Sequence, residues 1–467
     1  MKGPENRGFG GRRGCFLFVF FLLFMLLSAE TARAKVARME ITERSIFAGG
    51  MPFGDVGPYE KIRGKLHYAV DVNNPANARI VDLKLAPRNA AGEVEFSGDF
   101  ILLKPVDLSK GNHRLLYEVN NWGRILMLGY YNDAPEHNNP STVEHAGNGW
   151  LMKQGYSLLW SAWNWDVEAV DQKLQIELPI ATENGQTITQ LIAAEIEVLN
   201  APTKVQPVAW GGSLCYETVN PGDNRIATLT IRDEPMGKRT EIPRDRWRFG
   251  KVKDGKVVTD STHVYYEDGF QPGKIYELLY VAKNPRVVGL GLAVVRDSIS
   301  FFHFETKDRR GSPNPLAVSP AENTRPDPEF AYIFGISQSG RVITHMIYEG
   351  FHVDEEGRMV FEAARPAVTG GGKGGFNFRF AQTTHHPSHI EGNYFPADFF
   401  GGDFSQKRRR NPVRPCERFE SFALRSDGRK RKHDAAEIMA RIVAKRLVDH
   451  LERAGFVVMK RPTIGGA

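Results

Sequence analysis

The sequence predicts an α/β protein with a mostly parallel sheet and flanking helices, plus a β-rich N-terminal part and a β-rich insertion. Three observations predict this class. Alternating apolar and polar residues dominate the first part of the body, from 36 to 108. A strand, a helix that ends in glycine and another strand then follow one another between 114 and 162, which is typical of parallel pairing. Alternating segments split by Gly, Pro and Asn return between 167 and 280.

Composition excludes several other classes. The chain has 467 residues, of which 41% are hydrophobic and 25% charged, so it is long enough to bury a large core and is neither disordered, collagen-like nor a coiled coil. Its three cysteines, Cys15, Cys215 and Cys416, are too few for a disulfide scaffold or a cysteine-rich zinc module. We expect no cofactor and no bound metal.

Charge is uneven along the chain. The formal net charge is +6, but residues 1–34 carry +3 and residues 407–467 carry +10, which leaves the body between them at −7. A basic whole chain would suggest binding to nucleic acid or an anionic membrane. Because the basic excess belongs to the ends, we expect no nucleic acid as a partner.

We predict a signal peptide at residues 1–34. A basic segment precedes an uninterrupted apolar run from Cys15 to Leu27, and an A-x-A cleavage site follows at Ala32 to Ala34. The run is shorter than the ~20 residues that a membrane-spanning helix needs. We therefore expect a cleaved signal peptide and a periplasmic or secreted protein. A retained N-terminal anchor is the alternative, and it would be the one membrane contact.

The body is predicted to begin with an N-terminal β-rich segment at 35–110. Residues 65–71 alternate and 99–104 form a short apolar run, with turn signals between them. The first half of the α/β core is predicted at 111–166. There, 114–120 reads as a strand, 150–155 as a helix end with a glycine stop, and 156–162 as the next strand.

A β-rich insertion is predicted at 167–280, and the second half of the core at 281–406. In that second half, Gly289 to Phe304 has helical spacing with one apolar face. Residues 330–334 form a compact apolar strand, 341–350 a helix that ends in glycine, and 364–369 a further strand. The tryptophan-rich stretch 160–165 could line an apolar pocket or pack in the core, and the pattern leaves both open.

One motif indicates a catalytic residue. The strand at 330–334 runs into GISQSG at 335–340 and then a helix, which is the context of a nucleophile elbow. The residues two before and two after the serine must be small. For Ser337 these are Gly335 and Ser339, whereas for Ser339 one of them would be the bulky Arg341. Ser337 is therefore the predicted nucleophile, and a serine that caps an ordinary helix is the alternative.

Backbone N–H groups could stabilise a developing oxyanion beside Ser337. The N–H of Gln338, at a helix N-terminus, is one predicted donor. The second is expected from the loop after an earlier strand, where Asn120 and Asn121 follow the strand at 114–119. An ordinary polar turn explains these two asparagines equally well.

Several segments together resemble a known family. GISQSGR at 335–341, EEGRMVF at 355–361, GGFNFRFAQ at 374–382 and GLGLAVVRD at 289–297 are similar to segments of a largely uncharacterised bacterial α/β-hydrolase domain family of secreted serine esterases. The resemblance runs from about 36 to about 405. It implies an α/β-hydrolase-like fold and a serine-hydrolase mechanism, but no particular substrate.

The end of the sequence departs from that pattern. In this fold an acid and then a histidine follow the serine, yet the composition changes abruptly at Lys407. Residues 407–467 are predicted to form a basic tail with one amphipathic helix at 434–453. The acid and histidine segment is therefore missing or replaced. His385 and His386 are possible bases by their order alone, and a plain polar loop is the alternative.

The sequence thus predicts an exported serine hydrolase that cleaves a small-molecule carboxylic ester through an acyl-enzyme on Ser337. The alternative is a catalytically impaired hydrolase-like protein without the acid and histidine of the triad, either a scaffold or a truncated product. The substrate and the oligomeric state do not follow from the sequence.

Overall fold

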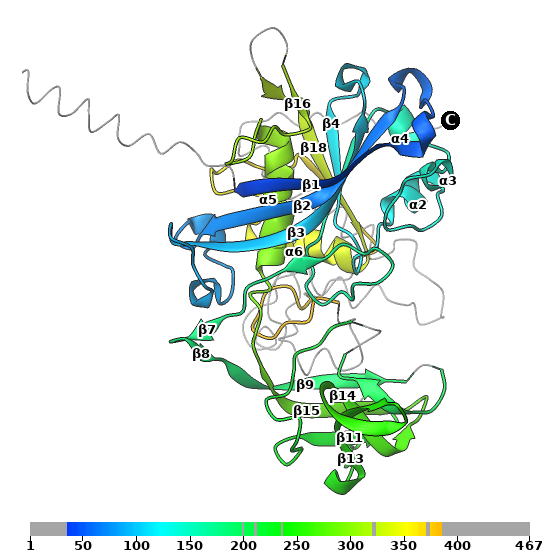
Figure 1. Ribbon diagram of the computed structural model, residues 1–467, viewed down its shortest axis with the longest axis vertical. Coiled ribbons are helices and arrows are strands. Elements are labelled where there is room, and N and C mark those ends of the chain that lie inside the picture. The colour runs from blue at the N-terminus through cyan, green and yellow to red at the C-terminus, as the bar shows by residue number, and fades with distance from the viewer. Residues whose placement is uncertain are drawn as a thin grey trace, which may run out of the picture. The chain divides into compact units, whose positions relative to one another are not determined.

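A computed structural model of the chain describes residues 35–198, 200–209, 213–234, 237–319, 324–369 and 374–384 (Figure 1). The predicted signal peptide, the predicted tail, and His385 and His386 lie outside these residues, so those expectations stay predictions. Within the described ranges, no helix is long and apolar enough to cross a membrane.

A large mixed sheet is the central feature of the described chain. Its strand order is β1-β2-β3-β5-β4-β18-β19, and β6 pairs with β3 beside this path. The strands β5, β4, β18 and β19 are parallel neighbours, whereas β1, β2, β3 and β5 pair antiparallel. The strands are β1 (Val36–Ile46), β2 (Tyr59–Asp71), β3 (Glu93–Pro105), β4 (Arg114–Glu118), β5 (Ser157–Ser161), β6 (Ile176–Glu177), β18 (Phe330–Ile336) and β19 (Ala363–Ala367).

The predicted mixed α/β class and β-rich N-terminal part are confirmed, but the prediction of a mostly parallel sheet is wrong for the N-terminal half. Parallel neighbours need a crossover connection, usually a helix. No α-helix lies between β1 and β2 or between β2 and β3. These long strands therefore pair antiparallel with their sequence neighbours. Gly64 permits the closest approach, because a Cβ there would lie 1.9 Å from the Glu40 carbonyl oxygen.

Side chains from the sheet alternate between two apolar cores. In β4, Leu115 and Tyr117 join a core that includes α5 (Leu290–Phe304) and α6 (Gln338–Glu349). Leu116 instead joins a core that includes α2 (Met127–Asn132) and α4 (Trp150–Lys153). Successive residues of a strand face opposite sides of the sheet, so α5 and α6 cover one face and α2 and α4 cover the other. A short helix, α3 (Val143–Ala146), lies between α2 and α4 in the chain.

Helix α5 differs from its prediction. The sequence suggested one apolar face, but every residue from Leu290 to His303 is buried. Figure 1 shows α5 crossing behind β1, β2 and β3. Its buried Arg296 donates to the Asp297 carboxylate at 2.7 Å and to Asn77 Oδ1 at 2.8 Å, so this charged pair of the helix is satisfied inside the protein rather than hydrated.

Smaller antiparallel sheets are built mainly from the segment between Thr189 and Lys283. One sheet has the order β12-β11-β15-β9 and another β10-β14-β13. This β character agrees with the sequence, while the predicted domain boundaries, including those of the insertion, stay a prediction. The strands are β7 (Thr182–Glu183), β8 (Gln186–Thr187), β9 (Thr189–Glu197), β10 (Thr203–Pro207), β11 (Thr228–Arg232), β12 (Thr240–Glu241), β13 (Trp247–Lys253), β14 (Lys256–Phe270), β15 (Ile275–Lys283), β16 (Ala317–Val318) and β17 (Arg325–Pro326).

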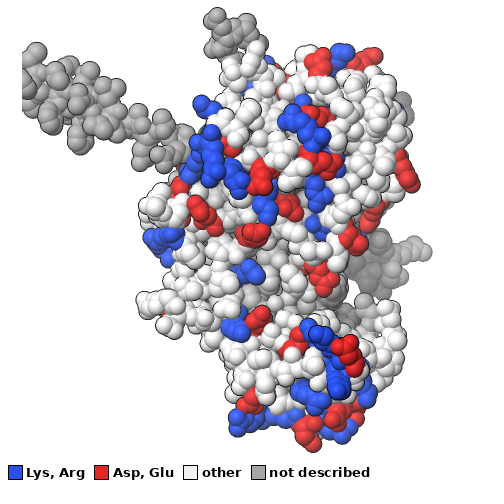
Figure 2. Space-filling view, in the orientation of Figure 1, with Lys and Arg blue, Asp and Glu red and all other residues white. Residues whose placement is uncertain are grey.

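Charged side chains of both signs are interspersed on the face shown in Figure 2. Charged side chains of the described residues also pair across strands, as in the ion pair of Lys65 with Glu177 at 2.6 Å. Exposed pairs of this kind contribute little to stability.

Candidate functional site

Ser337 lies at the sharp turn between β18 and α6. Its backbone angles are φ 55° and ψ −114°, a conformation that non-glycine residues rarely adopt. Ser337 is exposed, whereas the residues on both sides of it, from Ile333 to Ile336 and from Gln338 to Gly340, are buried. The turn therefore presents one hydroxyl to solvent at the carboxyl end of the parallel strands. The catalytic role predicted for Ser337 stays a prediction.

Small residues make this turn possible. A Cβ on Gly335 would lie 2.7 Å from the Ser339 carbonyl oxygen, and one on Gly340 would lie 2.8 Å from that of Ala367. Ser339 is buried, and its Oγ both donates to the Ile336 carbonyl and accepts from the Ile336 N–H, each at 2.9 Å. Ser339 thus closes the turn. The elbow pattern predicts small residues at Gly335 and Ser339, but it does not include Gly340, whose constraint comes from β19.

The start of α6 offers backbone donors beside the hydroxyl. The N–H groups of Gln338, Ser339 and Gly340 form the first turn and have no acceptor within the helix. Further along, the Arg341 N–H donates to the Ser337 carbonyl at 3.0 Å, which is the first helical bond. The Ser337 N–H itself donates to the Ala367 carbonyl at 2.9 Å and ties the turn to β19.

The loop after β4 supports the turn. The Asn121 side chain donates to the Ile336 carbonyl at 2.8 Å. The backbone N–H of Asn121 donates to the Arg124 carbonyl at 3.0 Å, so it is already bonded within its own loop. The oxyanion role predicted for the backbone N–H groups of Asn120 and Asn121 stays a prediction. The Asn120 side chain is also used, because it donates to the Ser161 carbonyl at 2.7 Å and accepts from the Gly123 N–H at 3.1 Å. The two asparagines connect the ends of β4, β5 and β18.

A buried carboxylate that the sequence pattern does not reveal is also linked by hydrogen bonds to the Ser337 turn. Asp166 follows β5 and accepts from the Thr384 N–H at 2.8 Å and the Thr384 hydroxyl at 2.6 Å, and also from the Thr383 hydroxyl. Burial raises the pKa of Asp166. The Thr383 carbonyl in turn accepts from the side-chain amide of Gln338. The available signal was weak: an aspartate just after a predicted strand, at the end of the tryptophan-rich stretch.

The tryptophan-rich stretch itself packs in the core. Trp160, Trp163 and Trp165 are all buried. Trp163 Nε1 donates to the Asn120 carbonyl at 2.8 Å, and Trp165 Nε1 donates to the Ala381 carbonyl at 3.0 Å. Of the two interpretations that the sequence left open, these burials favour core packing.

Glu118 is a second buried carboxylate, at the end of β4. It accepts from Trp160 Nε1 at 2.5 Å and from the N–H groups of Leu126 and Met127 at 2.9 Å each. Burial is the largest influence and raises the pKa of Glu118 to about 7. Glu118 therefore fixes the start of α2 against the sheet. Among the described residues, no group of three or more His, Cys, Asp or Glu side chains could hold a metal ion.

Comparison with known proteins gives one informative match. No family model matches the chain, and no solved structure matches it. The chain is similar to a D-alanine--D-alanine ligase of Gluconobacter oxydans (strain 621H), with 32% identity over 145 residues. The match covers 31% of this chain and 37% of the ligase, so the chain spans little more than a third of the length of this curated relative.

This match contradicts the family and function predicted from the sequence. The relative is a ligase rather than a serine hydrolase, and no hydrolase family model matches, so the predicted α/β-hydrolase family and ester hydrolysis are wrong. The alternative of an impaired hydrolase is not supported either. Neither the comparisons nor the described residues show a signal peptide or secretion. The prediction was wrong because it relied on an exposed serine at a strand-to-helix turn. Such a turn is a local backbone geometry and does not determine which reaction a protein catalyses.

Proposed function

We propose that the Ser337 turn binds the carboxylate of an amino acid and that this chain serves a ligase that joins such a carboxylate to an amine. The observation that carries the proposal is the exposed Ser337 hydroxyl beside the first-turn N–H groups of α6. The similarity to a D-alanine--D-alanine ligase supports the reaction class.

The physical fit is between an anion and the positive end of a helix. The N-terminus of a helix favours negative charge, and its free N–H groups donate to carboxylate oxygens. Hydrogen bonds to an ionised acceptor are stronger than neutral ones. A carboxylate at this turn would accept from the Ser337 hydroxyl and from N–H groups of Gln338 and Gly340. The hydrogen-bonded Asn121 and Asp166 networks hold these donors in place.

The same donors suit the chemistry of a ligase. Forming an amide from a carboxylate requires transfer of a phosphoryl group from ATP to that carboxylate, which releases ADP. An amine then attacks the acyl phosphate, the new C–N bond forms, and inorganic phosphate leaves. The attack places negative charge on an oxygen of a tetrahedral intermediate, which fixed N–H donors stabilise. Ser337 acts here by binding and orienting the carboxyl group.

We also propose, as architecture alone, an α/β-hydrolase-like arrangement of the core around β4, β5, β18 and β19. The parallel order of these strands, with α5 and α6 on one face, supports it. A fold of this kind hosts many unrelated activities, so the arrangement is compatible with ligase chemistry.

The test is release of ADP from ATP by the purified full chain, with and without D-alanine. We expect release that depends on D-alanine, because an ATP-driven ligase consumes ATP only when its carboxylate substrate is bound. Ser337→Ala removes the hydroxyl donor and should lower the D-alanine-dependent rate by about tenfold or more.

Ser141→Ala is the matched control, because Ser141 is exposed and its backbone hydrogen bonds are with Ala48 and His145 rather than with the turn. It should keep the rate of the unmodified chain. Release of ADP that is absent, independent of D-alanine, or equal in Ser337→Ala and Ser141→Ala contradicts the proposal.

A further inference from the structure

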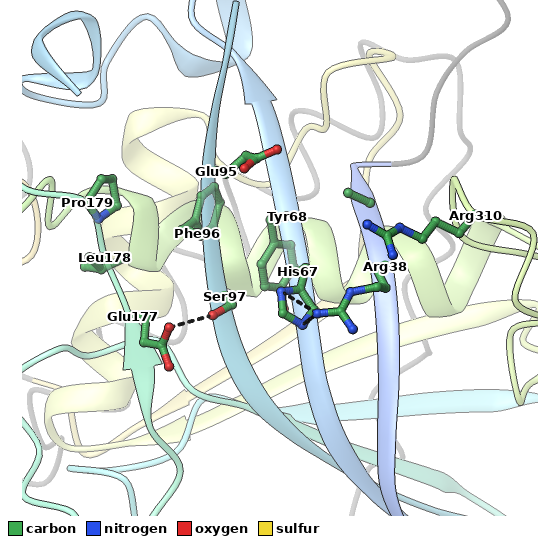
Figure 3. A pocket seen from close by; sticks show the side chains of 11 residues that line it. Arg38, His67, Tyr68, Glu95, Phe96, Ser97, Glu177, Leu178, Pro179 and Arg310 are labelled. Atoms are coloured by element: carbon green, nitrogen blue, oxygen red, sulfur yellow. Dashed lines mark hydrogen bonds between the residues drawn. The ribbon is translucent and has the colours of Figure 1, made fainter. Parts of the chain in front are cut away.

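A second site is suggested by a cavity of about 430 Å³ on the outer face of β1, β2 and β3 (Figure 3). Its size is within the usual range for small-molecule sites. Four side chains come from directly paired positions on neighbouring strands: Arg38 pairs with His67, His67 with Ser97, and Ser97 with Glu177 of β6. The sheet register thus places a row of polar groups along the floor of the cavity.

Two arginines line one side of the cavity. Figure 3 shows Arg38 and Arg310 on the same side, with Glu177 and Pro179 on the opposite side. Arg38 is held by Glu40 at 2.7 Å and by His67 Nε2 at 2.6 Å. Burial lowers the pKa of His67, which favours the neutral ring that accepts from Arg38. Arg310 lines the cavity and forms no ion pair with any described residue.

The cavity also carries an uncompensated negative charge. Glu177 is neutralised by Lys65 at 2.6 Å. Glu95 lines the cavity too, and its contact is with the neutral side-chain amide of Asn89 at 2.9 Å. Within the described chain Glu95 has no ion-pair partner. Arg310 and Glu95 are therefore opposite charges that face one cavity and are not matched by a neighbouring side chain.

We propose that this cavity binds a small zwitterion of amino-acid or dipeptide size, with its carboxylate at Arg38 and Arg310 and its ammonium group at Glu95. Arginine matches a carboxylate in geometry and charge. Glu40 and His67 fix Arg38 before a ligand arrives, which reduces the entropy that binding would cost. This site is built from β1, β2, β3, β6 with the residues that follow it, and the segment after α5, and it shares no residue with the Ser337 turn.

The test is a titration of the full chain with glycylglycine, followed by the backbone amide NMR signals of His67 and Ser97. We expect saturable shifts at these two residues. Arg310→Gln and Glu95→Gln should each weaken binding about tenfold, the effect of one lost charge-assisted contact. Lys307→Gln and Glu329→Gln are matched controls, because they remove the same charges from exposed positions that do not line the cavity.

Two ligand analogues separate the ends of the site. N-Acetylglycine lacks the ammonium group and should bind more weakly, with no further loss in Glu95→Gln. Glycine methyl ester lacks the carboxylate and should lose its dependence on Arg310. No shift at His67 and Ser97, or equal losses in the cavity variants and the charge controls, overturns the proposal. The titration uses neither ATP nor turnover, so its failure is distinct from failure of the proposed ligase activity.

Discussion

Ser337 adopts a backbone conformation that suits glycine better than serine, with φ 55° and ψ −114°. Such a residue stores strain of about 1–3 kcal/mol, which the surrounding structure must offset. The Ala367 carbonyl, the Asn121 side chain and the Ser339 hydroxyl all contact the turn and hold it. Strain retained at an exposed hydroxyl is typical of a residue kept for function rather than for stability.

The first prediction is that Ser337→Gly stabilises the fold while it weakens carboxylate binding. Relief of the positive φ should raise the free energy of unfolding by about 1 kcal/mol, measured by urea denaturation. Ser337→Ala keeps the strain and should change the stability little. Ser141→Gly, at an exposed position without positive φ, should destabilise instead. Equal losses in Ser337→Gly and Ser141→Gly would show that the turn is not strained.

Two stacked histidines form a pH-sensitive contact between α2 and α4, with His137 before α3 and His145 within α3. The rings of His137 and His145 lie 3.8 Å apart between centroids. His145 Nδ1 accepts from the N–H groups of Ser141 and Thr142, and His137 Nδ1 accepts from that of Asn139. These bonds require unprotonated Nδ1 atoms. Burial, and then the neighbouring His137, lower the pKa of His145, while Glu144 raises it and Lys61 lowers it.

The second prediction concerns this histidine pair. Because the folded state lowers the pKa of His145, the unfolded chain binds more protons below about pH 6.5, and this contact loses stability as the pH falls. His145→Asn keeps an acceptor at the same position but does not titrate. Lowering the pH from 7.5 to 5.5 should therefore lower the melting temperature of the unmodified chain more than that of His145→Asn. These two pH values lie about one unit above and below the ordinary histidine pKa of about 6.5. A difference in melting temperature between the two chains that does not depend on pH contradicts it.

At the scale of elements, the end of β4 organises both helices and loops. Glu118 fixes the start of α2, and Asn120 and Asn121 connect β4 to β5 and β18. Because these residues follow one short strand, the support of the Ser337 turn and the position of α2 depend on the same segment.

The third prediction follows from the pKa of Glu118, which burial raises from 4.5 to about 7. Between these two pH values the Glu118 carboxyl is protonated in the folded chain and ionised in the unfolded chain. The free energy of unfolding should therefore fall as the pH rises from about 4.5 to about 7, and ionisation of Glu118 should not change it further above that range. The expected loss is about 3 kcal/mol. Glu118→Gln cannot ionise, so urea denaturation should show a smaller loss of stability over this range. If the free energy of unfolding of Glu118→Gln falls with pH as steeply as that of the unmodified chain, other groups cause the pH dependence.

Much of the element pattern could be predicted, because it depends on local periodicity. The strands near β2, β3, β5 and β18 follow from alternation and short apolar runs, and α6 follows from its glycine stop. The position of helix α5 in the sequence was predicted correctly, but the burial of all its faces was not. Its burial on all sides depends on the sheet and on the ion pair of Arg296 with Asp297, which no helical period reveals.

At the scale of the whole molecule, the long-range contacts could not be predicted. Asp166 meets Thr383 and Thr384 across more than 200 residues of sequence. The antiparallel half of the sheet likewise depends on which strands pair, not on their own patterns. The predicted function was wrong for a related reason. The Ser337 turn is specified by nearby residues, whereas the reaction depends on side chains that the fold brings to the turn from distant parts of the sequence.

The two proposed sites use different parts of the molecule. The Ser337 turn lies at the carboxyl end of the parallel strands, where ligands bind in open α/β sheets. The cavity at Arg38 and Glu95 lies on the antiparallel strands β1 to β3. The mixed sheet thus supplies one site from each half, and each can be tested with variants that leave the other intact.

Carboxylate binding at the Ser337 turn is tested most directly by titration of D-alanine into the isotope-labelled full chain, followed by the amide signals of Gln338, Ser339 and Gly340. We expect saturable shifts of these signals, with D-alanine binding about tenfold weaker in Ser337→Ala and unchanged in Ser141→Ala. Signals that do not move at any D-alanine concentration, or that move equally in both variants, would contradict carboxylate binding at the Ser337 turn.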